Sequence, residues 1–160
     1  MAEDAENIVG NATTDNINRL ARVLQSESSV GNDNERTAVG WTVLNRMSRN
    51  NTNSVSDVDH AYSRNQAPTQ TMRDLAGRLL RGEIPDPTNG ATHYYSPRTM
   101  PQEGGDTTRY DVGGGLEQVD GLQTRNYRPG WATTFQPSTV TGVRPNYYQF
   151  YTAPGNNPVR

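Results

Sequence analysis

The hydrophobic residues near the start of the chain repeat with the period of an α-helix. Thr14 or Asp15 can cap this helix, and Glu27 lies seven residues after Leu20 and three after Leu24, so it shares their apolar face. The spacing predicts a short amphipathic helix that ends near Glu27 and places one carboxyl group against hydrophobic side chains. The apolar residues that set the period are Ile17, Leu20, Ala21 and Leu24.

A second helix is expected after a polar turn rich in Gly and Asn, from about Glu35 to Met47. Its apolar residues cover most of its circumference, which is typical of a central, buried helix. A third helix is predicted from Thr69 to Arg81, ending before Gly82, and residues 48–68 form a polar connection. The apolar residues of the second helix are Ala38, Val39, Trp41, Val43, Leu44 and Met47.

The second half of the chain favours strands and loops. Residues 91–95, Ala-Thr-His-Tyr-Tyr, lie between turn residues and Pro97 and predict a strand, and the aromatic residues 147–151 predict a final one. Glycines 113–115 have neither the lysine nor the capped helix of a phosphate-binding loop. The expected fold class is α+β, mostly helical, with a small β hairpin or sheet in the C-terminal half.

The length of 160 residues fits one domain, and a hydrophobic share of 31% indicates a small core beneath long polar loops. We expect a flexible leader over residues 1–14, a single domain over residues 15–152 and a flexible tail over residues 153–160. No apolar run reaches membrane-spanning length, so membrane insertion is not expected.

Composition narrows the chemistry further. There is no cysteine, and His60 and His93 are the only histidines, so disulfides, thiolate metal sites and a His-rich zinc site are excluded. All 15 basic residues are arginine, which excludes Schiff-base lysine chemistry and a P-loop lysine. The net charge of −2 and the scattered arginines argue against a nucleic-acid partner. A mixed His/carboxylate metal site is the alternative that these residue types leave open, and we expect neither metal nor cofactor.

Glu27 is the candidate catalytic residue. A carboxyl group held against hydrophobic groups tends to keep its proton, because desolvation disfavours the charged form, and a protonated carboxyl group is the general acid that glycoside cleavage requires. The alternative is an exposed glutamate at a helix end. Glu35 is the candidate second carboxylate, but its position at the start of a helix favours a capping role, and Asp33 is interpreted as a turn residue.

The order and spacing of these residues resemble the cell wall hydrolase family typified by the spore cortex-lytic enzyme SleB. That family has a helix ending in a catalytic Glu, a Gly-containing turn and a helix of the form A-V-x-x-V-x-L-N-R. The residues here that match in type and register are Glu27, Ala38, Val39, Leu44, Asn45 and Arg46.

The C-terminal half extends the resemblance, which covers roughly residues 19–151. Gly82, the Asp86-Pro87 turn and residues 91–97, A-T-H-Y-Y-S-P, follow the family pattern, as does the Trp131-Ala132 pair. Residues 27–32, E-S-S-V-G-N, depart from the usual E-A-R-G-E-P. Their Glu-Ser pair instead resembles the soluble lytic transglycosylases, which share a lysozyme-like helical core.

The resemblance implies a lysozyme-like fold and an enzyme that cleaves the β-1,4 bond between N-acetylmuramic acid and N-acetylglucosamine, with Glu27 as the acid. Without a clear second carboxylate, the implied reaction is lytic transglycosylation, in which one Glu is first acid and then base. A muramidase that activates water through Asp33 or Glu35 is the alternative. An N-acetylmuramoyl-L-alanine amidase is chemically poor, because zinc ligands are lacking.

The candidate substrate-binding residues are mostly aromatic. Tyrosine and tryptophan rings stack on sugars, although only one of Tyr94 and Tyr95 can face a cleft from a strand. Ser28 could orient Glu27 or bind an N-acetyl group. For the aromatic residues the alternative is core packing, and for Asn45 and Arg46 we expect structural hydrogen bonds. The full set of candidates is Ser28, His93, Tyr94, Tyr95 and Trp131.

The expected partner is the glycan strand of peptidoglycan, together with other virion or lysis proteins in the case of a phage enzyme. The acidic start of the sequence lacks the pattern of a secretory signal. We therefore expect delivery to the periplasm or cell exterior by a phage virion, holin-type lysis or a dedicated export machine. The competing class is a non-catalytic peptidoglycan-binding or virion structural protein, and the position of Glu27 favours the enzyme.

Overall fold

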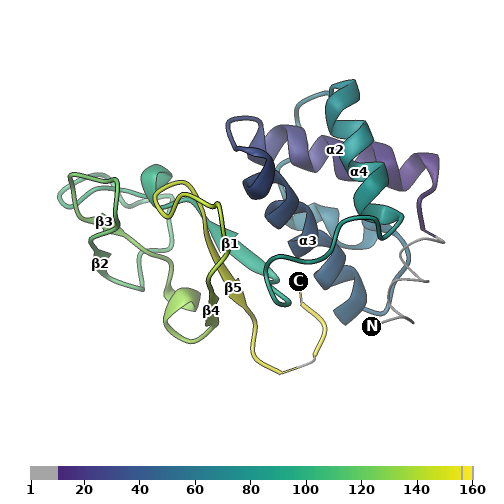
Figure 1. The fold of residues 1–160 in the computed structure, drawn as a ribbon. Helices are drawn as coiled ribbons and strands as arrows, with labels where there is room; N and C mark the ends of the chain where they lie inside the picture. Colours follow the sequence, from purple (N-terminus) through teal and green to yellow (C-terminus); the bar gives the residue numbers. More distant parts are fainter. Residues whose placement is uncertain (1–10, 156, 160) are drawn as a thin grey trace.

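Within the residues described, 11–155 and 157–159, three α-helices pack together on one side of the molecule and short antiparallel strands occupy the other (Figure 1). The computed structural model has α2 at Thr14–Ser28, α3 at Asp33–Arg49 and α4 at Gln70–Leu80. The predicted fold class, α+β and mostly helical with a small sheet in the C-terminal half, is confirmed. None of the helices in this part of the chain is long and apolar enough to cross a membrane.

Side-chain caps set the start of each helix. The cap of α2 is Thr13, whose hydroxyl accepts from the Asn16 amide at 3.2 Å, so the prediction of Thr14 or Asp15 was wrong by one or two residues. Thr69 caps α4 from outside the helix. Gly82 follows α4 with a φ of 73°, a left-handed conformation that glycine adopts at little cost and that ends the helix as predicted.

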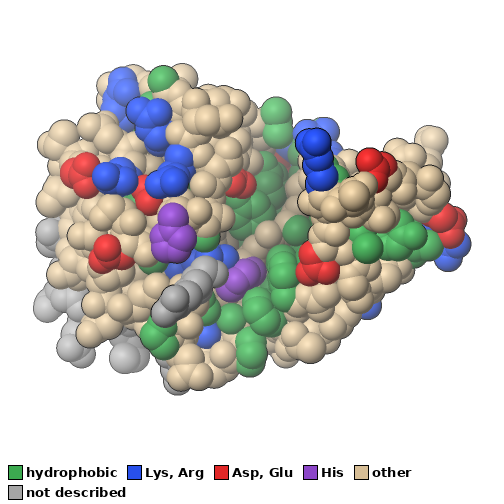
Figure 2. All heavy atoms as spheres, turned by 180° about the vertical axis from the view of Figure 1, so that it is seen from behind, with side chains coloured by type: hydrophobic (Ala, Val, Ile, Leu, Met, Phe, Trp, Pro, Cys, Tyr) green, Lys and Arg blue, Asp and Glu red, His purple; other side chains and the backbone are tan. Residues whose placement is uncertain are grey.

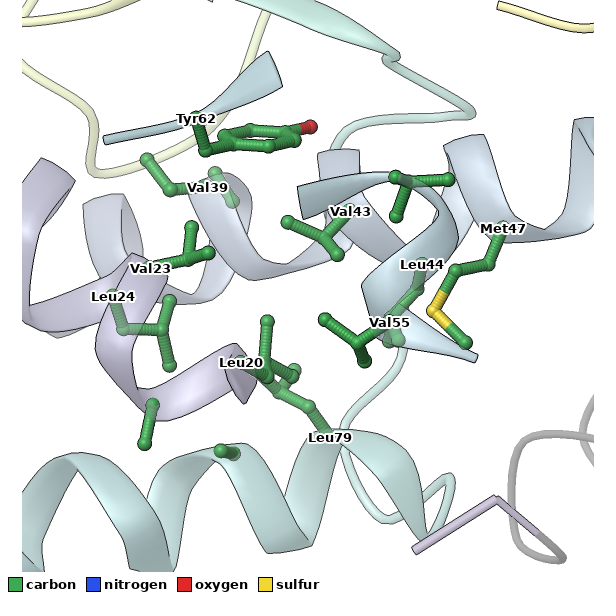
Figure 3. Packing of buried hydrophobic residues seen from close by; sticks show 14 of the residues in the cluster. Leu20, Val23, Leu24, Val39, Val43, Leu44, Met47, Val55, Tyr62 and Leu79 are labelled. Carbon is green, nitrogen blue, oxygen red and sulfur yellow. The ribbon is translucent and has the colours of Figure 1, made fainter. Parts of the chain in front are cut away.

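The main core lies between the three helices (Figure 3). Leu20 and Leu24 of α2 meet Val43 of α3 and Leu79 of α4, and all four side chains are buried. The helices α3 and α4 approach closely at Gly40, where an added Cβ would lie 2.5 Å from Leu79 Cδ1. This close approach explains a glycine in the middle of a helix, where it otherwise lowers stability.

The connection between α3 and α4 is more structured than its polar sequence predicts. It contains two short 3₁₀ helices, Val55–Asp57 and Asp59–Ala61. Val55 and Val58 are spaced three residues apart and both enter the core, while Tyr62 closes the top of the core in Figure 3. The segment therefore covers the helices instead of looping free of them.

The main sheet contains β1 (His93–Tyr95), β5 (Gln149–Thr152) and β4 (Gln136–Ser138), in the order β1-β5-β4. All pairings are antiparallel. A separate pair, β2 (Leu116–Glu117) with β3 (Asn126–Tyr127), extends from it. The strand predicted over 147–151 begins two residues later.

The sheet separates two groups of aromatic side chains. Tyr94 is paired with Phe150 across β1 and β5, and both pack against the helical core. Their neighbours Tyr95 and Tyr151 point to the opposite face and join a second cluster with Trp131. This division follows from the alternation of side chains along a strand.

The ends of the described chain contact the helices. Asn50, after α3, exchanges two hydrogen bonds with the backbone of Val159, at 2.9 and 2.8 Å. Asn11 is buried and its side-chain amide donates to Asn53. Residues 1–10 of the predicted leader lie outside the described residues. The assignment of a flexible leader and a flexible tail stays a prediction.

Candidate active site

A cleft of about 350 Å³ lies where the end of α2 faces the main sheet. The space-filling view shows a furrow between the helical and sheet halves, with hydrophobic side chains gathered in it (Figure 2). The lining is mixed, with tyrosines, small polar residues and two arginines around one carboxyl group. The lining residues are Ser26, Glu27, Val30, Arg46, Ala61, Tyr62, Tyr94, Tyr95, Ser96, Arg98, Thr99, Tyr147 and Tyr148.

Glu27 is held in this cleft by groups from three parts of the chain. It lies in the last turn of α2, and its backbone carbonyl accepts from the Tyr148 hydroxyl at 3.0 Å. Its Oε1 accepts from the Ser63 amide at 2.6 Å, and its Oε2 accepts from the Tyr94 hydroxyl. The side chain is partly exposed, so the carboxyl group is oriented by the protein and still open to the cleft.

Tyr94 is a fixed hydrogen-bond donor to Glu27. Burial raises the pKa of its hydroxyl well above the usual 10, and the negative charge of Glu27 raises this pKa further. The phenol therefore keeps its proton at any physiological pH. The ring packs against both Phe150, with centroids 5.6 Å apart, and Tyr148, at 5.8 Å, which restricts its position.

Glu27 is the only carboxylate among the described residues that line the cleft. The two other candidates lie elsewhere. Asp33 is fully exposed at the start of α3, and Glu35 is 0% exposed in a capping box with Asn32. The predicted capping role of Glu35 is confirmed, and the structure does not bring Glu35 or Asp33 to Glu27.

Glu35 is also bound by a cation. Its Oε1 accepts from Arg144 Nη2 at 2.6 Å, and its Oε2 accepts from Arg144 Nε at 3.0 Å. Burial acts to raise the pKa of Glu35, but the hydrogen bonds from Arg144 and from the Asn32 amide outweigh it and lower the pKa below 4.5. Glu35 is therefore an ionised structural anchor.

The structure places Ser28 away from the cleft. Its side chain is 0% exposed, and its hydroxyl donates to the Leu24 carbonyl at 2.7 Å. Ser28 is four residues after Leu24, so it occupies the buried face of α2, while Glu27 lies at the edge of that face. Contact of the Ser28 side chain with substrate does not fit this position.

His93 and Trp131 also lie outside the cleft, in the aromatic cluster on the far face of the sheet. Their rings are 5.4 Å apart, and Phe135 packs 4.9 Å from His93. Burial lowers the pKa of His93 to about 4, with Arg46 and Arg49 adding to the effect, so the imidazole is neutral near pH 7. His93 and Trp131 are therefore packed among other aromatic rings, which agrees with the alternative of core packing.

Tyr95 contributes to the cleft wall but directs its hydroxyl elsewhere. That hydroxyl donates to Glu117 on β2, and the ring stacks on Tyr151 with centroids 5.9 Å apart. Tyr94 alone of the two presents its hydroxyl to Glu27. The expectation that only one of these neighbours faces the cleft with its side chain agrees with this geometry.

The Asn-Arg pair on α3 fastens the sheet to the helices. Asn45 donates to the Asp86 carboxylate at 3.0 Å and to the Ala91 carbonyl at 2.9 Å, and Arg46 Nε donates to the Thr92 carbonyl at 2.6 Å. The predicted structural hydrogen bonds are therefore confirmed. Arg46 also reaches the cleft, with its guanidinium carbon 5.1 Å from the centroid of the Tyr62 ring.

A second, wider hollow of about 660 Å³ also has Tyr62 in its lining. Its buried carboxylate, Asp59, accepts from Arg19 at 3.2 Å and from Arg64 at 3.0 Å. Both carboxylate oxygens are thus occupied by cations. This arrangement suits a structural ion-pair group, and Glu27 remains the carboxyl group with an open approach.

Several cleft residues were not predicted from the sequence. Ser63 contributes only its backbone amide, and a backbone amide cannot be recognised from residue type. Tyr62 lies in the segment that was predicted to be a polar connection. Tyr147 and Tyr148 belong to an aromatic run that predicted a strand, and the run gave no indication that they line the cleft. Their backbone amides donate hydrogen bonds to the Arg144 carbonyl, at 3.0 and 3.1 Å, and this turn keeps them out of β5.

Metal ligands do not gather in the described part of the chain, where no group of three or more His, Asp or Glu side chains converges.

Comparison with protein families gives a match to the family described as Cell Wall Hydrolase over residues 31–112. Comparisons with curated proteins and with solved structures give no match. The matched segment includes α3, α4 and β1, and it begins four residues after Glu27.

Proposed function

Because the chain belongs to the cell wall hydrolase family, we propose that it cleaves the glycan strands of peptidoglycan with Glu27 as its single acid and base. The bond cleaved is the β-1,4 linkage between N-acetylmuramic acid and N-acetylglucosamine. The observation that carries this proposal is that Glu27 is the only carboxylate lining the cleft within the described residues, held there by Ser63 and Tyr94.

The reaction begins with proton transfer from Glu27 to the glycosidic oxygen as the bond from that oxygen to C1 of the muramoyl residue breaks. The Ser63 amide and the Tyr94 hydroxyl then stabilise the carboxylate that this transfer leaves. The muramoyl 6-hydroxyl attacks C1 and gives its proton to Glu27, which restores the acid and forms a 1,6-anhydro ring. The attacking hydroxyl belongs to the same substrate, so it has a high effective concentration.

The resemblance to spore cortex-lytic enzymes and to soluble lytic transglycosylases supports this reaction and a lysozyme-like relationship for the helical half. The single domain proposed over residues 15–152 agrees with a cleft built from both halves. In that cleft the rings of Tyr62, Tyr147 and Tyr148 are the surfaces available for sugars, alongside Tyr94. Direct sugar binding by His93 and Trp131 finds no support in the cleft geometry.

Mass spectrometry of digested peptidoglycan tests the proposal. We expect glycan fragments that end in 1,6-anhydro-muramoyl groups, without new reducing ends, and a rate that EDTA leaves unchanged. Predominantly reducing-end fragments would instead indicate a hydrolysing muramidase. Released stem peptides with intact glycan chains would indicate an amidase, and binding without any cleavage would indicate a non-catalytic wall-binding protein.

A further inference from the structure

One arginine in the cleft pairs with no carboxylate of the described residues. Seven arginines of the described chain form ion pairs with Asp or Glu. Four others donate side-chain hydrogen bonds without forming an ion pair, namely Arg46, Arg49, Arg73 and Arg128. Among the described residues, Arg22, Arg98 and Arg109 have neither an ion pair nor a side-chain hydrogen bond to protein. Of these three, Arg98 alone lines the cleft that contains Glu27.

Arg98 is held in position by an aromatic ring. Its guanidinium carbon lies 4.0 Å from the centroid of the Tyr147 ring, and its backbone amide donates to the Asn146 carbonyl at 3.0 Å. Arg144 lies against the same ring, with its guanidinium carbon 3.5 Å from the centroid. A cation over a tyrosine ring is stabilised by the ring's electrostatic field and loses part of its rotational freedom.

The two cations on Tyr147 differ in what neutralises them. Arg144 is bound through two hydrogen bonds by the buried carboxylate of Glu35, which cancels its charge. Arg98 is exposed and keeps its charge and its N–H donors available to the cleft. The end of the cleft formed by Arg98 and Tyr147 therefore carries a positive charge that is not neutralised by any carboxylate in the described part of the chain.

A guanidinium group fits a carboxylate through two parallel hydrogen bonds. On the glycan strand of the proposed function, carboxylates occur only on the muramoyl substituent, either in the peptide stem or as the free lactyl group. We propose that Arg98, presented on Tyr147, is an anion subsite that binds a carboxylate of this substituent. The subsite selects muramoyl-containing strands over neutral β-1,4-linked N-acetylglucosamine polymers. The proposal rests on the proposed function for its substrate.

Binding to a protein that cannot turn over its substrate tests the subsite. Calorimetry on Glu27→Gln would use three soluble oligosaccharides of equal length: a peptide-bearing glycan, the same glycan stripped of peptide, and a neutral chito-oligosaccharide. Adding Arg98→Gln should weaken binding of the anionic oligosaccharides about 5- to 20-fold and that of the neutral one much less. Added salt should reduce this loss of affinity for the anionic oligosaccharides, because it screens the charges. Arg98→Lys should retain more of that affinity than Arg98→Gln, because it keeps the positive charge.

Arg109→Gln is the matched control, because Arg109 is also exposed and unpaired in the described structure but lies outside the cleft lining. It should keep the ratio of anionic to neutral affinity. The anionic oligosaccharide that loses more affinity identifies the source of the carboxylate. Equal weakening of all three oligosaccharides by Arg98→Gln, or the same loss from Arg109→Gln, would overturn the subsite.

Failure of this subsite can be told apart from failure of the proposed function. Cleavage is measured separately, on the protein with Glu27 intact. Glycan cleavage without any charge preference in binding overturns the anion subsite alone. Charge-selective binding that depends on Arg98, in a protein that cleaves no glycan, overturns the proposed reaction and supports the subsite.

Discussion

The two ends of the turn between α2 and α3 hold their glutamates in opposite ways. Glu27, at the C-terminal end of α2, is partly exposed and accepts two hydrogen bonds. Glu35, at the start of α3, is fully buried and accepts four, from the amides of Asn32 and Arg144 and from two nitrogens of the Arg144 side chain. The helix dipole favours negative charge at the start of a helix and opposes it at the end.

The two carboxyl groups differ in whether they can exchange a proton with a substrate or only stabilise the fold. A buried carboxylate that accepts four hydrogen bonds has all its lone-pair sites filled by protein donors, so it cannot exchange a proton with a substrate without losing one of those bonds. A carboxyl group with two donors and an open side can do so. The comparison predicts that changes at Glu27 affect the rate, and that changes at Glu35 affect the free energy of unfolding.

The largest expected effect is loss of activity in Glu27→Gln. Clearing of purified cell walls, followed by turbidity, should slow by about a thousandfold or more, because removal of a general acid and base typically costs 10² to 10⁴ in rate. The free energy of unfolding should change by no more than about 1 kcal/mol, since the amide is nearly the same size and the site is partly exposed. Unfolding of the variant would instead make Glu27 a structural residue and remove the basis of the catalytic proposal.

Glu35→Gln is expected to lower the free energy of unfolding by about 2–4 kcal/mol, because it breaks a buried ion pair whose cation is partly exposed. The pKa of Glu35 is lowered in the folded state, so its stabilisation is complete above its ordinary value of 4.5 and is lost as pH falls through the folded value. Urea titrations at pH 7 and pH 4 should therefore show a smaller acid loss in the variant.

Activity per folded molecule provides the control for Glu35→Gln. Below its melting temperature the variant should clear walls at a rate close to that of the unchanged protein. A folded Glu35→Gln protein without activity would contradict the assignment, and it would favour a mechanism with two carboxylates.

Tyr94→Phe should lower kcat about tenfold, because it removes one charge-assisted hydrogen bond to Glu27 and keeps the ring. Tyr95→Phe is the matched comparison, since its hydroxyl bonds Glu117 on the other side of the sheet. We expect a much smaller loss of kcat there. Equal losses in the two variants, measured on soluble glycan fragments, would show that the Tyr94 hydroxyl has no special role.

The helices were predictable because their signals are local. The period of Leu20 and Leu24 located α2, and the alternation along β1 required Tyr94 and Tyr95 to lie on opposite faces. Which tyrosine faces Glu27 depends on how the sheet meets α3, and residue types alone do not specify that. The same holds for Ser28, whose side chain lies on the buried face of α2, because one residue along a helix turns a side chain by about 100°.

The partners of Glu27 depend on contacts distant in sequence. Ser63 lies 36 residues away and Tyr148 lies 121 residues away, and both act only after the chain has folded. The strands β2 and β3 have two residues each, too few to show a period. The sequence therefore predicts the helix α2 and the position of Glu27 on it, whereas the rest of the cleft depends on tertiary packing.

The smallest expected effect is a loss of folding stability in acid. It arises at His93, which, like Glu35, lies outside the cleft. Burial lowers the pKa of His93 from 6.5 to about 4, so between these values the unfolded chain binds a proton that the folded protein does not. Stability is then full above pH 6.5 and falls as pH drops toward 4. After allowance for the partial exposure of the ring, we expect this loss to be about 1 kcal/mol.

His93→Asn should flatten this part of the stability curve while lowering it overall, because the ring contacts with Trp131 and Phe135 are lost. His60→Asn is the matched control, since His60 is the other histidine and is exposed. Thermal unfolding between pH 4 and 7 measures both. If the slope of stability against pH were unchanged in His93→Asn, the loss of stability in acid would come from carboxylates instead. Glu35 would be the first to test, and its contribution disappears only below pH 4.5.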